Sequence, residues 1–201
     1  MEKELIRSAK KGNTDAFEKL AEKYYIRIYN YSLRVLKNEQ DALDASQDAL
    51  IKAYININKF KEEANFFTWL FRITVNTCND YHKRNKKRGL LYPIDNSDEN
   101  TPGIIIEDKT QNIEEKIIEN ERKNQLYKAI DSLPEIHRKM ILLRDIENFT
   151  YDEIAEIINL PLGTVKSKIS RARLKLKELL LKNKELFIVF TVILTEKLFF
   201  K

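Results

Sequence analysis

The chain of 201 residues has very little cysteine and histidine. Its single cysteine, Cys78, excludes an intramolecular disulfide and is typical of a protein that works in a reducing cytoplasm. The only two histidines, His82 and His137, stand far apart in the sequence, so metal-ligand spacing is absent. Cys78 has no evident catalytic partner and is expected in the core. These shortages argue against an enzyme, and we predict no metal, no cofactor and no small-molecule substrate.

Long apolar runs are missing as well. No stretch reaches the roughly 20 apolar residues that cross a bilayer, and the first residues, Met1 to Glu4, lack the apolar centre of a signal peptide. The apolar C-terminal tail, residues 186–201, is too short to span a membrane. It can pack on the preceding helices, or contact a membrane surface or an inhibitor, and its role stays open. We therefore expect a cytoplasmic protein.

Glycine and proline are scarce, with four of each, and half of them gather in one short segment. Such a cluster is typical of a linker between two helical blocks, and it consists of Gly89, Pro93, Pro102 and Gly103. Residues 89–121 carry nine acidic and two basic side chains. We predict a flexible acidic linker at 89–118 between two small domains, residues 1–88 and 119–185.

Both blocks show the spacing of helices. Apolar residues recur at steps of three and four, and no segment alternates with period two. In the first block this predicts helices that start at Asn13 or Thr14, near Asp41 and near Phe67. In the second block it predicts helices at about 119–131, 135–146, 151–158 and 162–182. The predicted fold class is all-α.

The last two of these helices have the pattern of a helix-turn-helix. Thr150 and Glu153 form a capping box, and Asn159 stands where the chain must turn. The final helix has an apolar stripe of Val165, Ile169, Ala172 and Leu176. Residues 160–185 contain eight basic and two acidic side chains, which suits a helix that enters the major groove. An αα-hairpin with a solvated basic face is the alternative.

The helix that starts near Phe67 mixes aromatic, asparagine and arginine residues. Such side chains can stack on unpaired bases and form hydrogen bonds with them. Residues 72–88 add six basic side chains against one acidic. Trp69, Leu70 and Ile73 are more typical of a core than of a stacking platform, and Asn76 can either satisfy the backbone or face a base.

The order of these motifs resembles that of the extracytoplasmic-function (ECF) sigma factors of bacterial RNA polymerase. Asp41 to Tyr54, Phe67 to Leu70, Arg72, Ile73 and Asn76 resemble domain two of that family. Leu133 to Glu135, Arg138, Tyr151 to Ala155 and Gly163 to Arg173 resemble domain four. The resemblance covers about residues 5–182, and it implies a non-enzymatic subunit that directs promoter recognition, DNA melting and transcription initiation.

The resemblance implies three sets of site residues and three partners. The partners are core RNA polymerase, promoter DNA and an anti-sigma factor, and the linker would thread the product-RNA channel. Core polymerase would bind Asp44, Gln47 and Asp48. The minus-ten element would contact Phe60, Asn65, Phe66, Arg72, Asn76 and Arg84. The minus-thirty-five element would contact Arg144, Lys166, Ser167, Lys168, Ser170 and Arg171.

The sequence departs from the family pattern in two places that bear on function. Asp48 stands where glutamate is usual, and the segment after Phe60 differs from the common loops, so the minus-ten base preference does not carry over. A conventional helix-turn-helix regulator that binds operators as a dimer is the rival class. It would need neither the Asp44-Gln47-Asp48 group and Trp69 nor an acidic linker.

Overall fold

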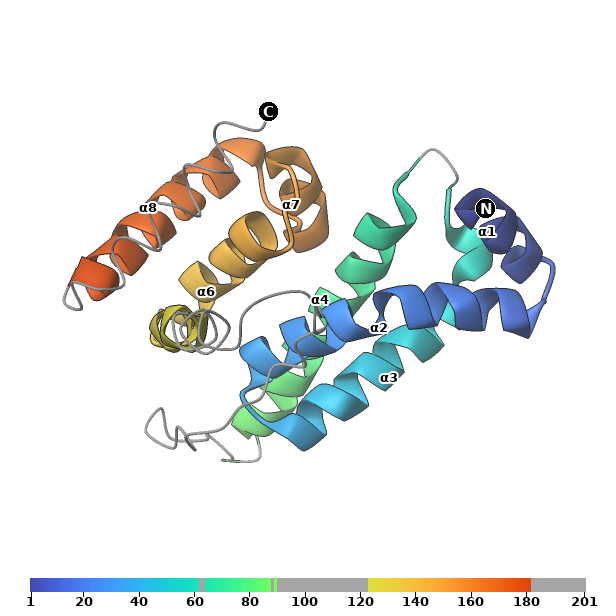
Figure 1. Cartoon of the computed structure of the whole chain (residues 1–201), viewed down its shortest axis with the longest axis horizontal. Coiled ribbons are helices and arrows are strands. Elements are labelled where there is room, and N and C mark those ends of the chain that lie inside the picture. Colours follow the sequence, from blue (N-terminus) through green and yellow to red (C-terminus); the bar gives the residue numbers. More distant parts are fainter. Residues whose placement is uncertain (62–63, 88, 90–122, 182–201) are drawn as a thin grey trace, which may run out of the picture. The chain divides into compact units, whose positions relative to one another are not determined.

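The computed structural model describes residues 1–61, 64–87, 89 and 123–181. Every regular element in these ranges is helical, and none of the described residues forms a strand (Figure 1). The all-α prediction is therefore confirmed. The predicted linker, apart from Gly89, and the apolar tail at 186–201 lie outside the described residues.

The described residues pack into two compact units, and each is considered by itself. One unit holds residues 1–61, 64–87 and 89 together with 152–160, and the other holds 123–151 and 161–181. The exact domain bounds at 88 and 119 stay a prediction.

The N-terminal helices are α1 (Glu2–Lys10), α2 (Thr14–Leu36), α3 (Glu39–Ile55), the short 3-10 helix η1 (Ile57–Lys59) and α4 (Phe66–Lys87). Helices α2, α3 and α4 correspond to the three predicted helices, whereas α1 and η1 were not predicted. Asparagine side chains cap the starts of all three. The Oδ1 atom of Asn13 accepts from the Ala16 N–H at 3.1 Å, and that of Asn38 accepts from Asp41 at 2.8 Å. Asn65 accepts from the N–H of Phe67 at 2.8 Å, which satisfies an otherwise orphaned donor of α4.

Helix α3 packs against both α2 and α4 through an inner face made of alanine (Figure 1). Small side chains allow helix backbones to approach closely, and the fully buried stripe consists of Ala42, Ala45, Ala49 and Ala53. Large residues fill the space beyond the stripe. The ring of Phe71 on α4 meets that of Tyr31 on α2 edge-on, with 4.8 Å between centroids. This core fixes the position of α4, which carries most of the predicted minus-ten residues.

Three further residues of α4 belong to the same core. Cys78 is fully buried, with its Sγ atom 3.3 Å from the Oγ atom of Ser32, as its predicted core role requires. Trp69 and Leu70 are buried too. Ile73 is only half-buried and therefore also reaches the surface.

The C-terminal part begins with helical residues at 123–131, followed by α6 (Glu135–Ile141). The helix predicted at 135–146 continues beyond α6, but its hydrogen bonding changes to that of a π-helix, η2 (Leu142–Ile146). Helices α7 (Tyr151–Ile158) and α8 (Leu162–Leu181) follow, close to the predicted bounds. The predicted apolar stripe of α8 is buried along its whole length.

An ion pair attaches α8 to η2. Nη2 of Arg173 lies 2.6 Å from Oδ1 of Asp145, and Nε of the same arginine donates to Oδ2 at 3.3 Å. Two parallel bonds between a guanidinium and a carboxylate set both distance and orientation. The pair therefore fixes the rotation of α8 about its axis, and with it the side chains that α8 exposes.

The described ranges offer neither a candidate membrane span nor a candidate metal site. None of the helices there is both long and apolar enough to cross a membrane. Within the same ranges, histidine, cysteine and acidic side chains do not gather in groups of three or more that could hold a metal ion.

Candidate nucleic-acid interface

An aromatic cluster occupies the approach to α4. Phe60 and Phe66 meet edge-on with 5.4 Å between centroids, and Trp69 lies 5.3 Å from Phe60 and 5.7 Å from Phe66. Phe60 and Phe66 are each 3% exposed. These two predicted minus-ten residues therefore offer a wall rather than an open stacking surface.

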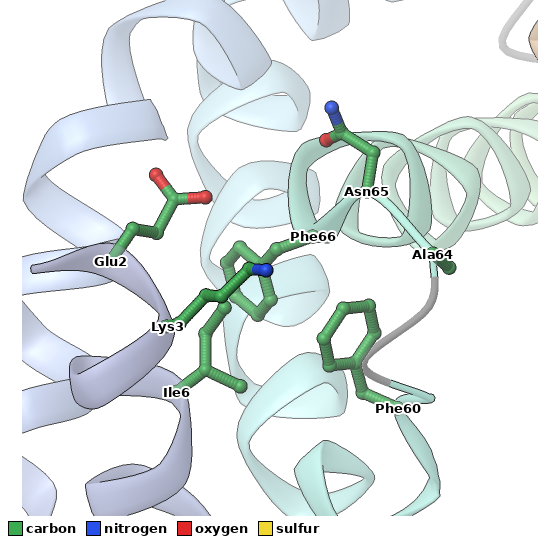
Figure 2. Close-up of a pocket in the computed structure, with 7 residues that line it drawn as sticks. All are labelled: Glu2, Lys3, Ile6, Phe60, Ala64, Asn65 and Phe66. Atoms are coloured by element: carbon green, nitrogen blue, oxygen red, sulfur yellow. The ribbon is translucent and has the colours of Figure 1, made fainter.

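One side of this wall borders a cavity of about 210 Å³ against α1, which we call the α1 pocket. Figure 2 shows Phe60 and Phe66 across from side chains of α1, with Asn65 near them at the start of α4. Three of the six predicted minus-ten residues thus meet here. The lining residues are Glu2, Lys3, Ile6, Phe60, Ala64, Asn65 and Phe66.

Glu2 holds α1 in its place beside the α1 pocket. Its Oε2 atom accepts from the Tyr24 hydroxyl at 2.7 Å and pairs with the Lys23 ammonium. Burial by itself would raise the pKa of Glu2, but the hydrogen bonds from Lys23 and Tyr24 outweigh it, so the pKa is lowered. The carboxylate is therefore charged at neutral pH.

A second cavity, of about 410 Å³, lies between the end of α3, η1 and α4. We call it the Asn76 pocket, because the exposed amide of Asn76 borders it. Trp69 and Ile73 supply its apolar wall. Arg72 and Asn76, two of the predicted minus-ten residues, line this pocket together with residues that were not predicted to belong to a site. The full lining is Lys52, Asn56, Lys59, Trp69, Arg72, Ile73, Asn76 and Thr77.

The unpredicted residues of the Asn76 pocket form a connected chain of hydrogen bonds. Nδ2 of Asn56 donates to the Lys52 carbonyl at 2.8 Å, while its Oδ1 accepts from Nζ of Lys59, also at 2.8 Å. Nζ of Lys52 donates to Oγ1 of Thr77 at 3.1 Å and lies 3.9 Å from Asp80. Residues 52, 56 and 59 follow one another at helical steps of four and three, which is the sequence signal that could have identified them.

Arg84, the remaining residue of the predicted minus-ten set, lines neither pocket. Its guanidinium lies over the ring of Tyr81, 4.5 Å from the centroid. It is exposed near the end of α4, among other basic residues. A side chain in this position is suited to a phosphate rather than to a base edge.

The outer face of α3 presents the predicted polymerase-binding residues. Oδ1 of Asp44 accepts from Gln40 at 3.0 Å, and Gln47 is exposed. Oδ2 of Asp48 accepts from the Tyr81 hydroxyl at 2.9 Å. Burial and this hydrogen bond raise the pKa of Tyr81 to about 12, so the phenol remains a donor at neutral pH. Asp48 is thereby held against α4.

Apolar residues continue this face beyond Asp48. Ile51 is 56% exposed and Ile55 is 71% exposed, an unusual exposure for large aliphatic side chains. They follow Asp48 at helical steps of three and four, and they were not predicted as site residues. The outer face of α3 is thus acidic at one end and apolar at the other.

The turn before α8 has the predicted geometry. Asn159 is in the left-handed region with φ of 52°, and the Leu160 N–H donates to the Ala155 carbonyl at 3.1 Å. Asparagine adopts this conformation more readily than most residues. The turn joins α7 to α8 in the order that the predicted helix-turn-helix requires.

Four of the predicted minus-thirty-five residues are exposed on α8 opposite its buried stripe, and they are Lys166, Ser167, Ser170 and Arg171. Lys168 is half-buried at the edge of that face. Oγ of Ser167 donates to the Thr164 carbonyl at 2.9 Å, so its lone pairs face outward as acceptors. The face is basic and hydroxyl-bearing, as base and phosphate contacts require.

Arg144 comes from the π-helix rather than from α8. Its Nη1 atom donates to the Phe149 carbonyl at 2.8 Å, and its guanidinium lies over Tyr151 at 4.8 Å from the ring centroid. The half-buried side chain is fixed at the start of α7. Whether it contacts DNA stays a prediction.

Family models match both parts of the chain. The model described as Sigma-70 region 2 matches residues 20–88, and that described as Sigma-70, region 4 matches residues 123–176. The chain is 36% identical over 183 residues to the ECF RNA polymerase sigma factor SigW of Bacillus subtilis, covering 89% of this chain and 96% of SigW. It is 34% identical over 170 residues to the ECF RNA polymerase sigma-E factor of Escherichia coli, covering 84% and 88%.

Solved structures show the same arrangement of helices. The sigma factor RpoE from Bartonella quintana, in complex with the anti-sigma factor NepR, aligns with a TM-score of 0.60 at 25% identity, over 83% of this chain and 98% of that one. CnrH, in complex with the cytosolic domain of CnrY, shares the fold with a TM-score of 0.63 at 23% identity, over 89% and 96%. Sequence and fold agree, and the chain belongs to the ECF sigma factors, the non-enzymatic subunits that give bacterial RNA polymerase its promoter specificity.

Proposed function

We propose that the Asn76 pocket captures one unpaired base of the minus-ten element while polymerase opens the promoter. The observation that carries the proposal is the exposed Asn76 amide beside an apolar wall and a polar rim. Unpairing a base costs a few kcal/mol, which a pocket can offset only if it engages both the ring and the freed edge. Trp69 and Ile73 would pack against the ring of the base, and the Asn76 amide would form hydrogen bonds with its freed edge.

The size and the charge of the Asn76 pocket support this proposal. Its volume of about 410 Å³ is enough for a single flipped base, and its mouth is open to solvent. Lys59 places positive charge at its rim, which attracts the backbone of a displaced strand. Lys52 and Arg72 also line the pocket, but each has a carboxylate partner, Asp80 at 3.9 Å and Glu156 at 3.1 Å. The α1 pocket, of about 210 Å³, is smaller, and the Glu2 carboxylate in its lining is already paired with Lys23.

Replacing Asn76 with alanine tests the proposal. We expect Asn76→Ala holoenzyme to form the closed complex normally but to melt a cognate promoter about fivefold less, since one buried hydrogen bond to a base contributes on the order of 1 kcal/mol. Permanganate footprinting measures unpaired thymines, and a gel shift measures the closed complex.

Asn58→Ala is the matched control for this experiment. Asn58 is an exposed asparagine in η1 that lines neither pocket. The Asn58→Ala variant should leave promoter melting unchanged. Normal melting by Asn76→Ala would remove Asn76 from the site, and equal losses in both variants would mean that the effect is not specific to the pocket.

The other two surfaces complete the proposal. The exposed face of α8, with Arg144, would read the minus-thirty-five element. The outer face of α3 would bind core polymerase through Asp44, Gln47 and Asp48, and the exposed Ile51 and Ile55 would extend that contact. Exposed apolar residues next to polar ones are typical of a protein interface.

An anti-sigma factor and a cytoplasmic location are also part of the proposal. The RpoE structure from Bartonella quintana contains an anti-sigma factor, which supports a similar inhibitor for this chain. Core polymerase and promoter DNA are both cytoplasmic in bacteria, so a protein that joins them must work there.

A further inference from the structure

We propose that the Asn76 pocket selects a base that carries a ring carbonyl, namely guanine, cytosine or thymine, against adenine, and that Lys59 sets this preference. The inference rests on the proposed function of the pocket. It adds the class of base that the pocket accepts and a residue that determines it. It depends on which hydrogen-bonding groups the pocket presents.

The described residues that line the pocket present mostly donors. Lys52, Lys59 and Arg72 are cationic side chains that can donate but cannot accept, and no carboxylate is among the lining residues. Asn76 can do both, and Thr77 already accepts from Lys52. A base that enters the pocket therefore meets mainly hydrogen-bond donors, and it binds well only if it presents hydrogen-bond acceptors to them.

Lys59 is the cation best placed to meet a base, because Nη1 of Arg72 already donates to Oε1 of Glu156 at 3.1 Å. Lys52 is drawn toward α4 by Thr77 and by Asp80, whose carboxylate offsets its charge. Lys59 is exposed in η1, and its ammonium is held by Oδ1 of Asn56. Asn56 is itself fixed by its bond to the Lys52 carbonyl. One of the three ammonium donors is thus used for positioning, and Asn56 acts as the positioning residue.

The chemistry of the bases then decides the preference. Guanine, cytosine and thymine each carry a carbonyl oxygen that accepts strongly from an ammonium group. Adenine carries none. Its ring nitrogens N1 and N7 flank the N6 amino group, so a lysine that approaches either of them also meets an N–H donor. Size does not discriminate, because a cavity of about 410 Å³ admits purines and pyrimidines alike.

The test uses holoenzyme and a promoter library randomised across the melted bases upstream of a mapped start site. For the wild type we expect adenine to be depleted about tenfold, relative to the other three bases, at one position among the opened promoters. Lys59→Gln should abolish that depletion, because glutamine pairs well with the N6 and N7 edge of adenine.

Lys19→Gln is the control, since it removes the same charge from an exposed position of α2 that lines neither pocket. It should keep the wild-type base profile. The proposal is overturned if wild type accepts adenine equally at every opened position. It is also overturned if Lys59→Gln lowers opening uniformly for all four bases, which is the behaviour of a phosphate contact, or leaves the depletion unchanged.

Running Asn76→Ala through the same library separates the two proposals. If that variant opens every sequence normally, the pocket does not hold a base and the proposed function fails. If it loses opening while Lys59→Gln keeps the wild-type preference, only the role of Lys59 fails.

Discussion

Truncation of Phe71 to alanine is expected to destabilise the N-terminal helices by about 3–5 kcal/mol, the usual result of removing a fully buried ring. Phe71 has no exposed surface, and its ring packs against Tyr31 on α2 and Phe67 on α4. Hydrogen exchange in the full-length protein measures the effect region by region. Amides of α2 and α4 should lose protection by about a hundredfold or more, since each 1.4 kcal/mol is a factor of ten.

Phe71→Leu is the matched variant, because it keeps most of the volume and should cost less than about 1.5 kcal/mol. Amides at 162–181, in the other unit, should keep their protection in both variants. A loss below about 1 kcal/mol in Phe71→Ala would contradict the core described for α2, α3 and α4. An equal loss in α8 would contradict two separately stable units.

Removal of Arg171 is expected to weaken binding to a cognate minus-thirty-five element by about 1–3 kcal/mol and to relax base preference there, provided that its guanidinium reads a base edge. Arg171 is exposed on α8 opposite the buried stripe, where a major-groove contact is possible. The preference is measured by site selection with holoenzyme that carries Arg171→Ala. An unchanged preference would show that Arg171 is not a base reader.

Lys168→Ala serves as the comparison within the same helix. Lys168 lies at the edge of the exposed face, half-buried, where a phosphate is a more accessible partner than a base. The variant should weaken binding to all sequences alike. It should also make the slope of log K against log salt concentration shallower by about one. A change in base preference would reverse this assignment.

Helices were predictable from the sequence where one face is buried along the whole element. The alanine stripe of α3 and the apolar stripe of α8 repeat at helical steps, so sequence spacing alone shows which side faces the core. The turn at Asn159 was predictable because a short polar side chain is the usual choice for a left-handed conformation.

Elements that depend on distant contacts were not predictable in this way. Helix α1 has only nine residues, and its position depends on Glu2 meeting Lys23 and Tyr24, more than 20 residues further along the chain. The π-helical turn at Leu142–Ile146 leaves the spacing of apolar residues nearly unchanged, so the sequence pattern cannot separate it from α-helix.

Only part of the candidate site was predictable, because which residues share a pocket depends on the fold and not on local spacing. The family motifs located Arg72 and Asn76, which line one pocket, but they placed Phe60, Asn65 and Phe66 with them, whereas these line another. Burial of both phenylalanines depends on the fold, not on local spacing. Lys52, Asn56 and Lys59 join the Asn76 pocket because α3 and η1 lie beside α4.

Promoter opening by the wild-type protein tests the central claim most directly. The measurement is permanganate reactivity of thymines upstream of a mapped start site, with core polymerase alone and with core polymerase plus this protein. Reactive thymines are expected in the minus-ten region only when the protein is present. Stable binding to duplex promoter DNA without reactive thymines at any mapped start site would contradict it.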